Sequence, residues 1–256
     1  MAAIRALVFL LFQTLVTPFY AAVMLLFFWL PRVPLYKMAA SWCSVVLFGA
    51  RWMCGIRYRI VGRENIPSTP SIVLSKHSST WETLALTQFF PPLAYVAKKE
   101  LLSIPFFGWG FRLASPITID RSAGTDAMQQ IAVQGRDRFR QGFWIVLYPE
   151  GTRIPPGRRA KYKTGGARLA VELGVPVIPV AHNAGYLWPK GLFGKRSGTL
   201  TMVIGKPISS TGRDAQSLMA EVEDWIEAEV ARLGDPVGAP PGSMSEATLE
   251  HDRRIP

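Results

Sequence analysis

The stretch 71–86, SIVLSKHSSTWETLAL, decides the fold, because a buried strand, a polar bend and the start of a helix follow one another within it. Residues 72–74 form the apolar run of the strand. The bend carries His77, and the hydroxyl residues at 78–80 are of the type that accepts hydrogen bonds from the amides of a first helical turn. The stretch therefore predicts a strand that leads into a helix through a bend holding a histidine.

His77 and Glu82 are five positions apart across this bend, so the first turn of the helix can bring the carboxylate back to a nitrogen of the imidazole. A neutral imidazole accepts a proton near pH 7, and a carboxylate on its second nitrogen fixes the tautomer and stabilises the imidazolium. The spacing alone favours the alternative, a purely structural pair. The sequence has no Gly-x-Ser-x-Gly motif and no cysteine near His77, so a base here would activate a hydroxyl group of a substrate.

The composition suggests membrane contact and an anionic partner. Apolar residues make up 49% of the 256 positions, and the formal charge is +11. The tail 235–256 holds four acids and two arginines, so the residues before it carry +13. Phospholipid head groups or phosphorylated substrates fit this charge better than nucleic acid, for which no binding motif is visible. Cys43 and Cys54 give neither a disulfide framework nor a metal set, which fits a reducing compartment.

The N-terminal residues 1–55 predict a membrane-associated helical hairpin. Residues 6–30 carry no charge and could reach across a bilayer, although Pro18 should kink the helix. The apolar run is too long for a cleaved signal peptide, the alternative reading. Residues 38–50 are also uncharged but too short to span, so they suit an interfacial helix folded back on the first. The first acid is Glu64, and it is preceded by Arg5, Arg32, Lys37, Arg51, Arg57, Arg59 and Arg63.

Six of those seven bases follow the long apolar run, and this asymmetry predicts the side of the membrane. Cytoplasmic flanks carry the excess of lysine and arginine, so we expect a bacterial-type inner membrane with residues 56–234 on its cytoplasmic face. The bases should also attract anionic lipid. The tail 235–256 is rich in Pro, Gly, Ser and Glu and is predicted to be disordered.

Within residues 56–234, strands and helices alternate, which predicts an α/β domain with a layered, mixed, largely parallel sheet flanked by helices. The expected strands are 58–61, 72–75, 94–97, 117–119, 144–147, 177–180 and 200–204. The expected helices are 81–89, 106–113, 126–141, 165–173 and 215–233.

Two further motifs follow strands, where α/β sheets bind ligands. Asp120-Arg121 ends one strand, and Arg121 could hold an anion there or form a plain surface ion pair. In the block 148–153, YPEGTR, the backbone amides near Gly151, together with Thr152, could donate to a phosphate or an oxyanion, and Arg153 offers a bidentate grip. A basic stretch containing Lys163 follows, just before a predicted helix start, and we expect Lys163 to help bind the phosphate of the acceptor. The alternative is a solvated basic loop.

Four blocks in this order resemble the glycerolipid acyltransferase family, in particular its membrane-associated 1-acylglycerol-3-phosphate acyltransferases. His77…Glu82 resembles the family's His-x4-Asp block, with Glu in place of Asp. The segment 115–121, SPITIDR, resembles the second block, with Ser115 where glycine is usual. YPEGTR resembles Phe-Pro-Glu-Gly-Thr-Arg, and 175–180, VPVIPV, resembles the fourth block. His182 follows this block and is predicted to be structural rather than a second base.

The resemblance implies roles for individual residues. His77 would be the general base and Glu82 its orienting acid, while Arg121, Glu150, Gly151, Thr152 and Arg153 would line the acceptor site. It also implies a two-helix N-terminal motif that dips into one leaflet, which matches the hairpin expected from the residues. The Glu in place of Asp should preserve activity and puts the acceptor subtype in doubt.

The expected activity is transfer of a fatty acyl group from acyl-CoA or acyl-carrier protein to the sn-2 hydroxyl of 1-acyl-glycerol-3-phosphate (lysophosphatidic acid). The product would be phosphatidic acid, an intermediate of phospholipid synthesis. A thiolate leaves readily, so we expect no metal, cofactor or acyl-enzyme. The alternatives are another lysophospholipid or a lyso-aminolipid as acceptor, a non-catalytic protein that binds membrane phospholipids, or a thioesterase.

Overall fold

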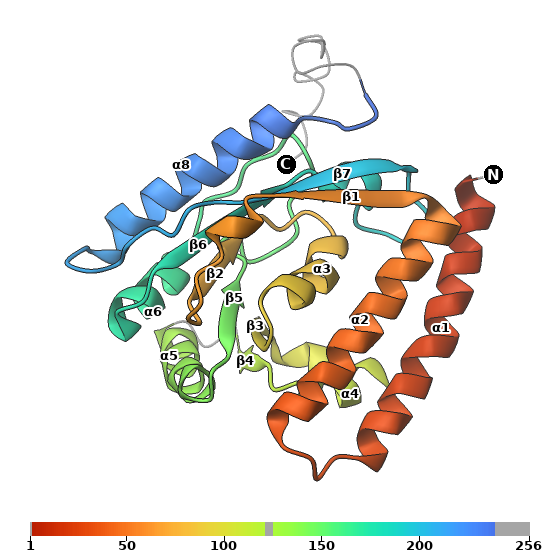
Figure 1. Cartoon of the computed structure of the whole chain (residues 1–256), viewed down its shortest axis with the longest axis horizontal. Helices are drawn as coiled ribbons and strands as arrows, with labels where there is room; N and C mark the ends of the chain where they lie inside the picture. The colour runs from red at the N-terminus through yellow and green to blue at the C-terminus, as the bar shows by residue number, and fades with distance from the viewer. Residues whose placement is uncertain (1, 121–124, 239–256) are drawn as a thin grey trace.

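The computed structural model describes residues 2–120 and 125–238 and is built around one seven-stranded sheet (Figure 1). The central strands, at residues 72–75, 144–147 and 177–182, are short and largely apolar, as buried strands of α/β proteins require. The strands are β1 (Ile56–Val61), β2 (Ile72–Ser75), β3 (Leu93–Lys98), β4 (Ile117–Ile119), β5 (Trp144–Leu147), β6 (Val177–His182) and β7 (Gly198–Ile204).

The sheet is mostly parallel, which confirms the predicted fold class. The strand order is β1-β7-β6-β2-β5-β3-β4, and every neighbouring pair is parallel except β6 and β7. All seven expected strands and all five expected helices of the domain are present, with ends shifted by at most two residues. The short helix α7 (Ala184–Leu187) was not expected from the sequence, nor were the one-turn helices Arg63–Asn65 and Lys99–Ser103.

Helices cover both faces of the sheet (Figure 1). One layer contains α5 (Thr125–Arg140), α6 (Gly165–Leu173) and α8 (Ala215–Leu233), which contact β4, β2 and β6 respectively. The other layer contains α3 (Trp81–Phe89), α4 (Phe107–Leu113) and the N-terminal pair α1 (Ala2–Leu26) and α2 (Arg32–Cys54). The result is a three-layer arrangement in which the central strands β2, β5 and β6 are buried along their whole length.

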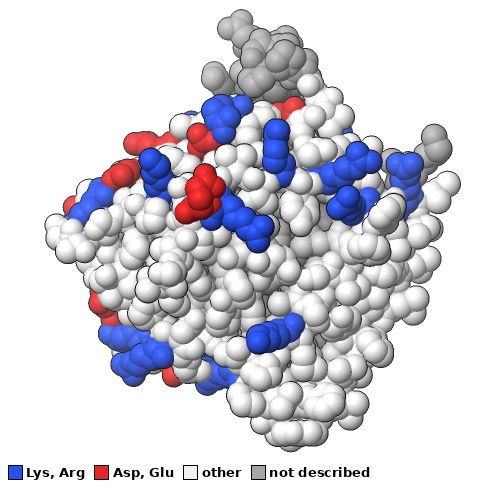
Figure 2. Space-filling model, in the orientation of Figure 1, with Lys and Arg blue, Asp and Glu red and all other residues white. Residues whose placement is uncertain are grey.

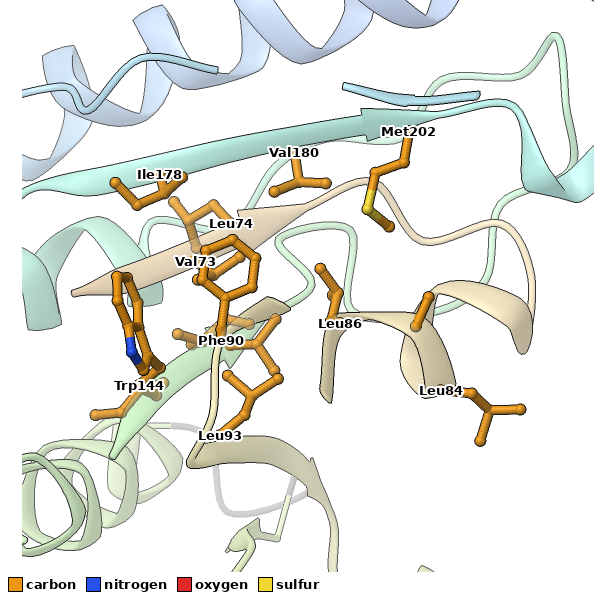
Figure 3. Packing of buried hydrophobic residues seen from close by; sticks show 14 of the residues in the cluster. Val73, Leu74, Leu84, Leu86, Phe90, Leu93, Trp144, Ile178, Val180 and Met202 are labelled. Atoms are coloured by element: carbon orange, nitrogen blue, oxygen red, sulfur yellow. The ribbon is translucent and has the colours of Figure 1, made fainter. Parts of the chain in front are cut away.

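The core between α3 and the sheet is continuous and apolar. Figure 3 shows Val73 and Leu74 of β2 between Ile178 of β6 on one side and Phe90 on the other. These side chains are fully buried, and burying such a side chain contributes about 1.5–3 kcal/mol. This packing holds β2 rigidly, and β2 leads directly into the bend that carries His77.

The N-terminal pair forms the predicted hairpin, but its second helix is longer than expected. Helix α2 begins at Arg32 and ends at Cys54, so with 23 residues it is long and apolar enough to cross a membrane, as is α1. The expectation of a second segment too short to span was therefore wrong, because charged residues at both ends extend the helix beyond the uncharged core. Helix α1 also continues through Pro18.

The hairpin packs against the α/β domain and exposes an apolar outer face. Phe9 of α1 is fully buried and makes an edge-on contact with Trp188, with ring centroids 5.2 Å apart. Outward, the exposed side chains include Leu15, Phe19, Phe28 and Trp52. Figure 2 shows few charged side chains at the lower right of the view, where the hairpin lies, whereas lysine and arginine lie mainly along the top and at the lower left. The expected disordered tail lies largely outside the described residues.

Candidate active site

Three loops meet at one edge of the sheet, because β2, β5 and β6 are parallel neighbours. The loop after β2 carries His77, the loop after β5 carries the block 148–153, and β6 ends at His182. A backbone hydrogen bond of 2.8 Å from the amide of Ile154 to the carbonyl of His77 joins the first two loops. The carboxyl ends of the strands therefore bring together the two motifs that the sequence analysis singled out.

His77 and Glu82 are in direct contact. Nδ1 of His77 lies 2.8 Å from Oε1 of Glu82, and the amides of Ser78 and Ser79 donate to the same oxygen at 3.0 and 2.9 Å. Because a carboxylate can only accept, the proton of the imidazole is assigned to Nδ1. The lone pair of Nε2 is then available to take a proton, and the half-buried ring lines a cavity.

Glu82 is fully buried and remains ionised. Burial by itself raises its pKa, but electrostatic interactions with His182 and His77, the hydrogen bond from His77 and the amide of Ser79 outweigh this, so the pKa lies below its ordinary value. The carboxylate thus keeps its charge throughout the neutral range. It can hold the imidazole in one tautomer and stabilise the protonated ring.

Tyr148 supports the imidazole from one face. The two rings are stacked with centroids 3.9 Å apart and planes inclined by 16°. The family block has phenylalanine at this position, and the Tyr148 hydroxyl has no hydrogen-bond partner among the described residues. The aromatic face, rather than the hydroxyl, therefore accounts for the contact with His77.

The cavity has a volume of about 760 Å³, with a polar end and an apolar end. The polar end holds His77 beside Thr80, and Nη1 of Arg153 donates to the hydroxyl of Thr80 at 3.0 Å. Lys98, Arg153, Lys163 and Lys190 are the basic residues of the lining, and none of its described residues is acidic. Such a wall favours an anion. The apolar end lies among α1, α2 and α4 and is lined by Met24, Tyr36, Trp42, Leu84, Leu101 and Phe107.

Most of the predicted acceptor residues line this cavity together with His77. Gly151, Thr152, Arg153 and Lys163 are all part of its wall. Gly151 has a φ of +73°, and a Cβ at this position would lie 3.3 Å from Nζ of Lys163, so a side chain would crowd the lysine. Arg121 lies outside the described residues, and its predicted contact with the acceptor stays a prediction.

Glu150 was expected to line the acceptor site, but its side chain points behind the histidine loop and is not part of the described cavity wall. Its Oε2 accepts a hydrogen bond of 2.6 Å from the amide of His77, and its Oε1 lies 2.7 Å from Nζ of Lys76. Lys76 also contacts Glu227 of α8. Neither Lys76 nor Glu227 was predicted from the sequence to support the site. The available signals were the position of Lys76 at the end of a buried strand and that of Glu227 next to the apolar face of α8, since charged residues are seldom buried without a partner.

His182 occupies a structural position, in agreement with the prediction. It is fully buried, its Nε2 donates to the carbonyl of Lys76 at 2.9 Å, and its Nδ1 accepts from the amide of Ala184 at 3.3 Å. Both nitrogens are therefore used in holding the end of β6 against the histidine loop. Its Nε2 is also 3.8 Å from Oε2 of Glu82.

Comparison with known proteins identifies the family. A family model described as Acyltransferase matches residues 57–183, which include His77, Glu82 and the block 148–153. A 1-acyl-sn-glycerol-3-phosphate acyltransferase of Pseudomonas aeruginosa is 45% identical over 196 residues, 75% of this chain and 76% of the relative. The chain belongs to the glycerolipid acyltransferase family.

Other similarities extend over most of this acyltransferase. The protein of the same name from Saccharomyces cerevisiae is 29% identical over 234 residues, 84% of this chain and 76% of the relative. The crystal structure of the 1-acyl-sn-glycerophosphate (LPA) acyltransferase PlsC from Thermotoga maritima matches with a TM-score of 0.75 and 26% identity. That match covers 93% of this chain and all of the PlsC chain, so the similarity includes the N-terminal helices as well as the α/β domain.

Proposed function

We propose that this acyltransferase moves a fatty acyl group from a thioester, acyl-CoA or acyl-carrier protein, to the sn-2 hydroxyl of 1-acyl-glycerol-3-phosphate, which yields phosphatidic acid. The observation that carries the proposal is the His77–Glu82 hydrogen bond of 2.8 Å, at the wall of a cavity that also contains Arg153 and Lys163. The proton acceptor thus lies in the same cavity as Arg153 and Lys163, whose positive charges suit a phosphate group. The names of the related proteins support the same acceptor.

The reaction needs one proton acceptor and one stabilised oxyanion. Nε2 of His77 takes the proton of the acceptor hydroxyl while the oxygen attacks the thioester carbon. Glu82 stabilises the imidazolium, and backbone amides near Gly151, or an arginine, offset the charge of the tetrahedral oxygen. When that intermediate collapses, the C–S bond breaks and the imidazolium returns the proton to the thiolate. No metal, prosthetic group or acyl-enzyme is required.

The shape of the cavity suits a lipid substrate. The phosphate would lie at the basic end with Arg153, Lys163 and, by the family resemblance, Arg121. The apolar end among α1, α2 and α4 has the character needed for an acyl chain. The hairpin would hold the cavity at the level of the lipid head groups. The basic residues at the end of α2 and directly after it, Arg51, Arg57 and Arg59, favour the cytoplasmic face of the membrane for the α/β domain.

One assay separates this proposal from its alternatives. Purified protein is incubated with radiolabelled acyl-CoA, with and without lysophosphatidic acid, and with other lysophospholipids or a lyso-aminolipid. Formation of phosphatidic acid that requires lysophosphatidic acid supports the proposal. Preference for another lysolipid would change the acceptor, and thioester loss without any acceptor would indicate hydrolysis. Lipid binding with no reaction would indicate a binding protein.

A further inference from the structure

A chain of polar contacts lies behind the cavity, buried between the sheet and α8. Nζ of Lys76 lies 2.7 Å from Oε1 of Glu150 and 2.7 Å from Oε1 of Glu227, and all three side chains are almost fully buried. The hydroxyl of Tyr162 donates to Oε1 of Glu227 at 2.8 Å. We call Lys76, Glu150, Tyr162 and Glu227 the buried charge network. None of its members is part of the described cavity wall.

Glu227 connects two loops that reach the cavity from different strands. It contacts Lys76, which directly precedes His77 in the chain. The amide of His77 in turn donates a hydrogen bond of 2.6 Å to Glu150. Glu227 also accepts a hydrogen bond from Tyr162, which directly precedes Lys163, and Lys163 lines the cavity. A single carboxylate on α8 therefore touches both the loop of the proton acceptor and the loop of the phosphate-binding bases.

Stability alone gives a weak reason for this network. The free energy that a buried ion pair loses by leaving water is often as large as the attraction between its charges. Apolar residues of the same volume therefore often stabilise the fold equally well. Nε of Arg159 lies 3.4 Å from Oε2 of Glu227 and balances its charge from the surface, where 71% of the arginine side chain is exposed. The network does, however, hold the backbone of both loops at defined positions. An ordered reaction geometry requires that kind of support.

We propose that Glu227 is a positioning residue of the acyl-transfer site, which fixes the histidine loop through Lys76 and the phosphate-binding loop through Tyr162. This inference rests on the proposed function, because it assigns a role in the same reaction. We call the contact of Glu227 with Lys76 the Lys76 branch and its contact with Tyr162 the Tyr162 branch, and we expect the two to affect the kinetics differently. Loss of the Tyr162 branch should weaken acceptor binding, and loss of Glu227 should affect both binding and turnover.

The Tyr162 branch is tested with Tyr162→Phe, which keeps the ring and removes only the hydroxyl. Steady-state kinetics with acyl-CoA and lysophosphatidic acid should show a KM for lysophosphatidic acid raised about tenfold and a kcat within about twofold of the unmodified enzyme, because a hydrogen bond to a charged group is lost. Direct binding of lysophosphatidic acid by titration calorimetry, in a His77→Ala background that does not turn over, should weaken by the same factor.

Glu227 itself, which both branches share, is tested with Glu227→Gln, which keeps the size of the side chain and removes its charge. We expect kcat to fall about tenfold and KM to rise as in Tyr162→Phe. The double variant should have the KM of Glu227→Gln alone, because Tyr162 acts through Glu227. Asp224→Asn is the matched control: it removes the same charge from an exposed position of α8 and should leave both constants unchanged.

The outcomes separate this inference from the proposed function. Unchanged kcat and KM in folded Glu227→Gln and Tyr162→Phe would overturn the inference while the proposed function stands. The same holds if both variants lose activity only in proportion to the folded fraction measured by circular dichroism. Absence of acyl transfer by the unmodified enzyme would overturn the proposed function itself, and the inference with it.

Discussion

The amide nitrogen of His77 lies 2.6 Å from Oε2 of Glu150, so the acid of the YPEGTR block binds the histidine loop from behind. The two motifs are thus joined by a hydrogen bond as well as by their positions on neighbouring strands. Within one block, Glu150 supports the backbone of the proposed base, whereas Gly151 to Arg153 face the cavity. This division of roles leads to different expectations for neighbouring residues.

Glu150→Gln should lower turnover more than acceptor affinity. The amide oxygen of glutamine can still accept from His77, but Lys76 loses the charge of one of its two carboxylates. We expect kcat to fall about tenfold with KM for lysophosphatidic acid within about threefold, since hydrogen bonds to charged groups contribute about 1.5–3 kcal/mol. Steady-state kinetics give both constants. A large rise in KM with normal kcat would instead place Glu150 at the acceptor.

Arg153→Ala should have the opposite pattern. Arg153 lines the cavity and its guanidinium is held by Thr80 at 3.0 Å, so its loss removes a grip on the acceptor phosphate. KM for lysophosphatidic acid should rise about tenfold to a hundredfold, with a smaller change in kcat. Arg153→Lys, which keeps the charge and loses the bidentate fork, serves as the control and should be intermediate. An unchanged KM in Arg153→Ala would move the phosphate site elsewhere.

Ser115→Gly should stabilise the protein. Ser115 is buried and has a φ of +62°, a conformation that L-residues adopt only at a cost, and the family usually has glycine there. After allowance for the greater freedom of glycine in the unfolded chain, we expect a gain of about 0.5–1 kcal/mol in the free energy of unfolding. Thermal unfolding in detergent measures it. Ala228→Gly in α8 should change stability in the other direction by a similar amount, and a destabilised Ser115→Gly would contradict the account.

The buried His182 should make stability depend on pH. Burial lowers its pKa below the ordinary 6.5, and the charge of Glu82 and the carbonyl of Lys76 do not compensate; nearby His77 and Lys76 add to the lowering. Below pH 6.5 the unfolded chain takes up a proton at this position and the folded chain does not, so the free energy of unfolding falls as the pH falls. The slope is at most about 1.4 kcal/mol per pH unit and ends at the folded-state pKa.

His182→Gln tests this expectation. Chemical unfolding of both proteins is measured between pH 7.5 and about pH 5, below which carboxylates dominate. The variant should be less stable at pH 7.5 but should lose less stability as the pH falls. Parallel curves for the two proteins would show that His182 does not cause the pH dependence.

The sequence predicted the fold well because its strands carry strong local signals. Runs such as Ile72–Ser75 and Trp144–Leu147 are apolar, short and followed by loop residues, and the structure reproduces both sets of bounds. The hairpin was predicted less well, since the length of α2 is set by charged end residues that a search for uncharged segments excludes. The four-residue helix α7 has no periodicity to detect.

The candidate site was predictable where its residues are close in sequence. The contact between His77 and Glu82 follows from one turn of chain, and the loops at Gly151 to Arg153 follow from the parallel order of β2 and β5. The orientation of Glu150 and its link to Glu227 were not predictable, because the side chain faces away from the cavity. That link depends on how α8, some 75 residues further along the chain, packs on the sheet.

The most direct test of the central claim measures acyl transfer by His77→Ala. Unmodified enzyme and variant are reconstituted in phospholipid vesicles with lysophosphatidic acid and radiolabelled acyl-CoA, and membrane binding and thermal unfolding are recorded for both. We predict that the variant binds vesicles and folds normally, and that its kcat/KM falls at least about a hundredfold. A folded, membrane-bound His77→Ala that still transfers acyl groups at the unmodified rate would contradict the account.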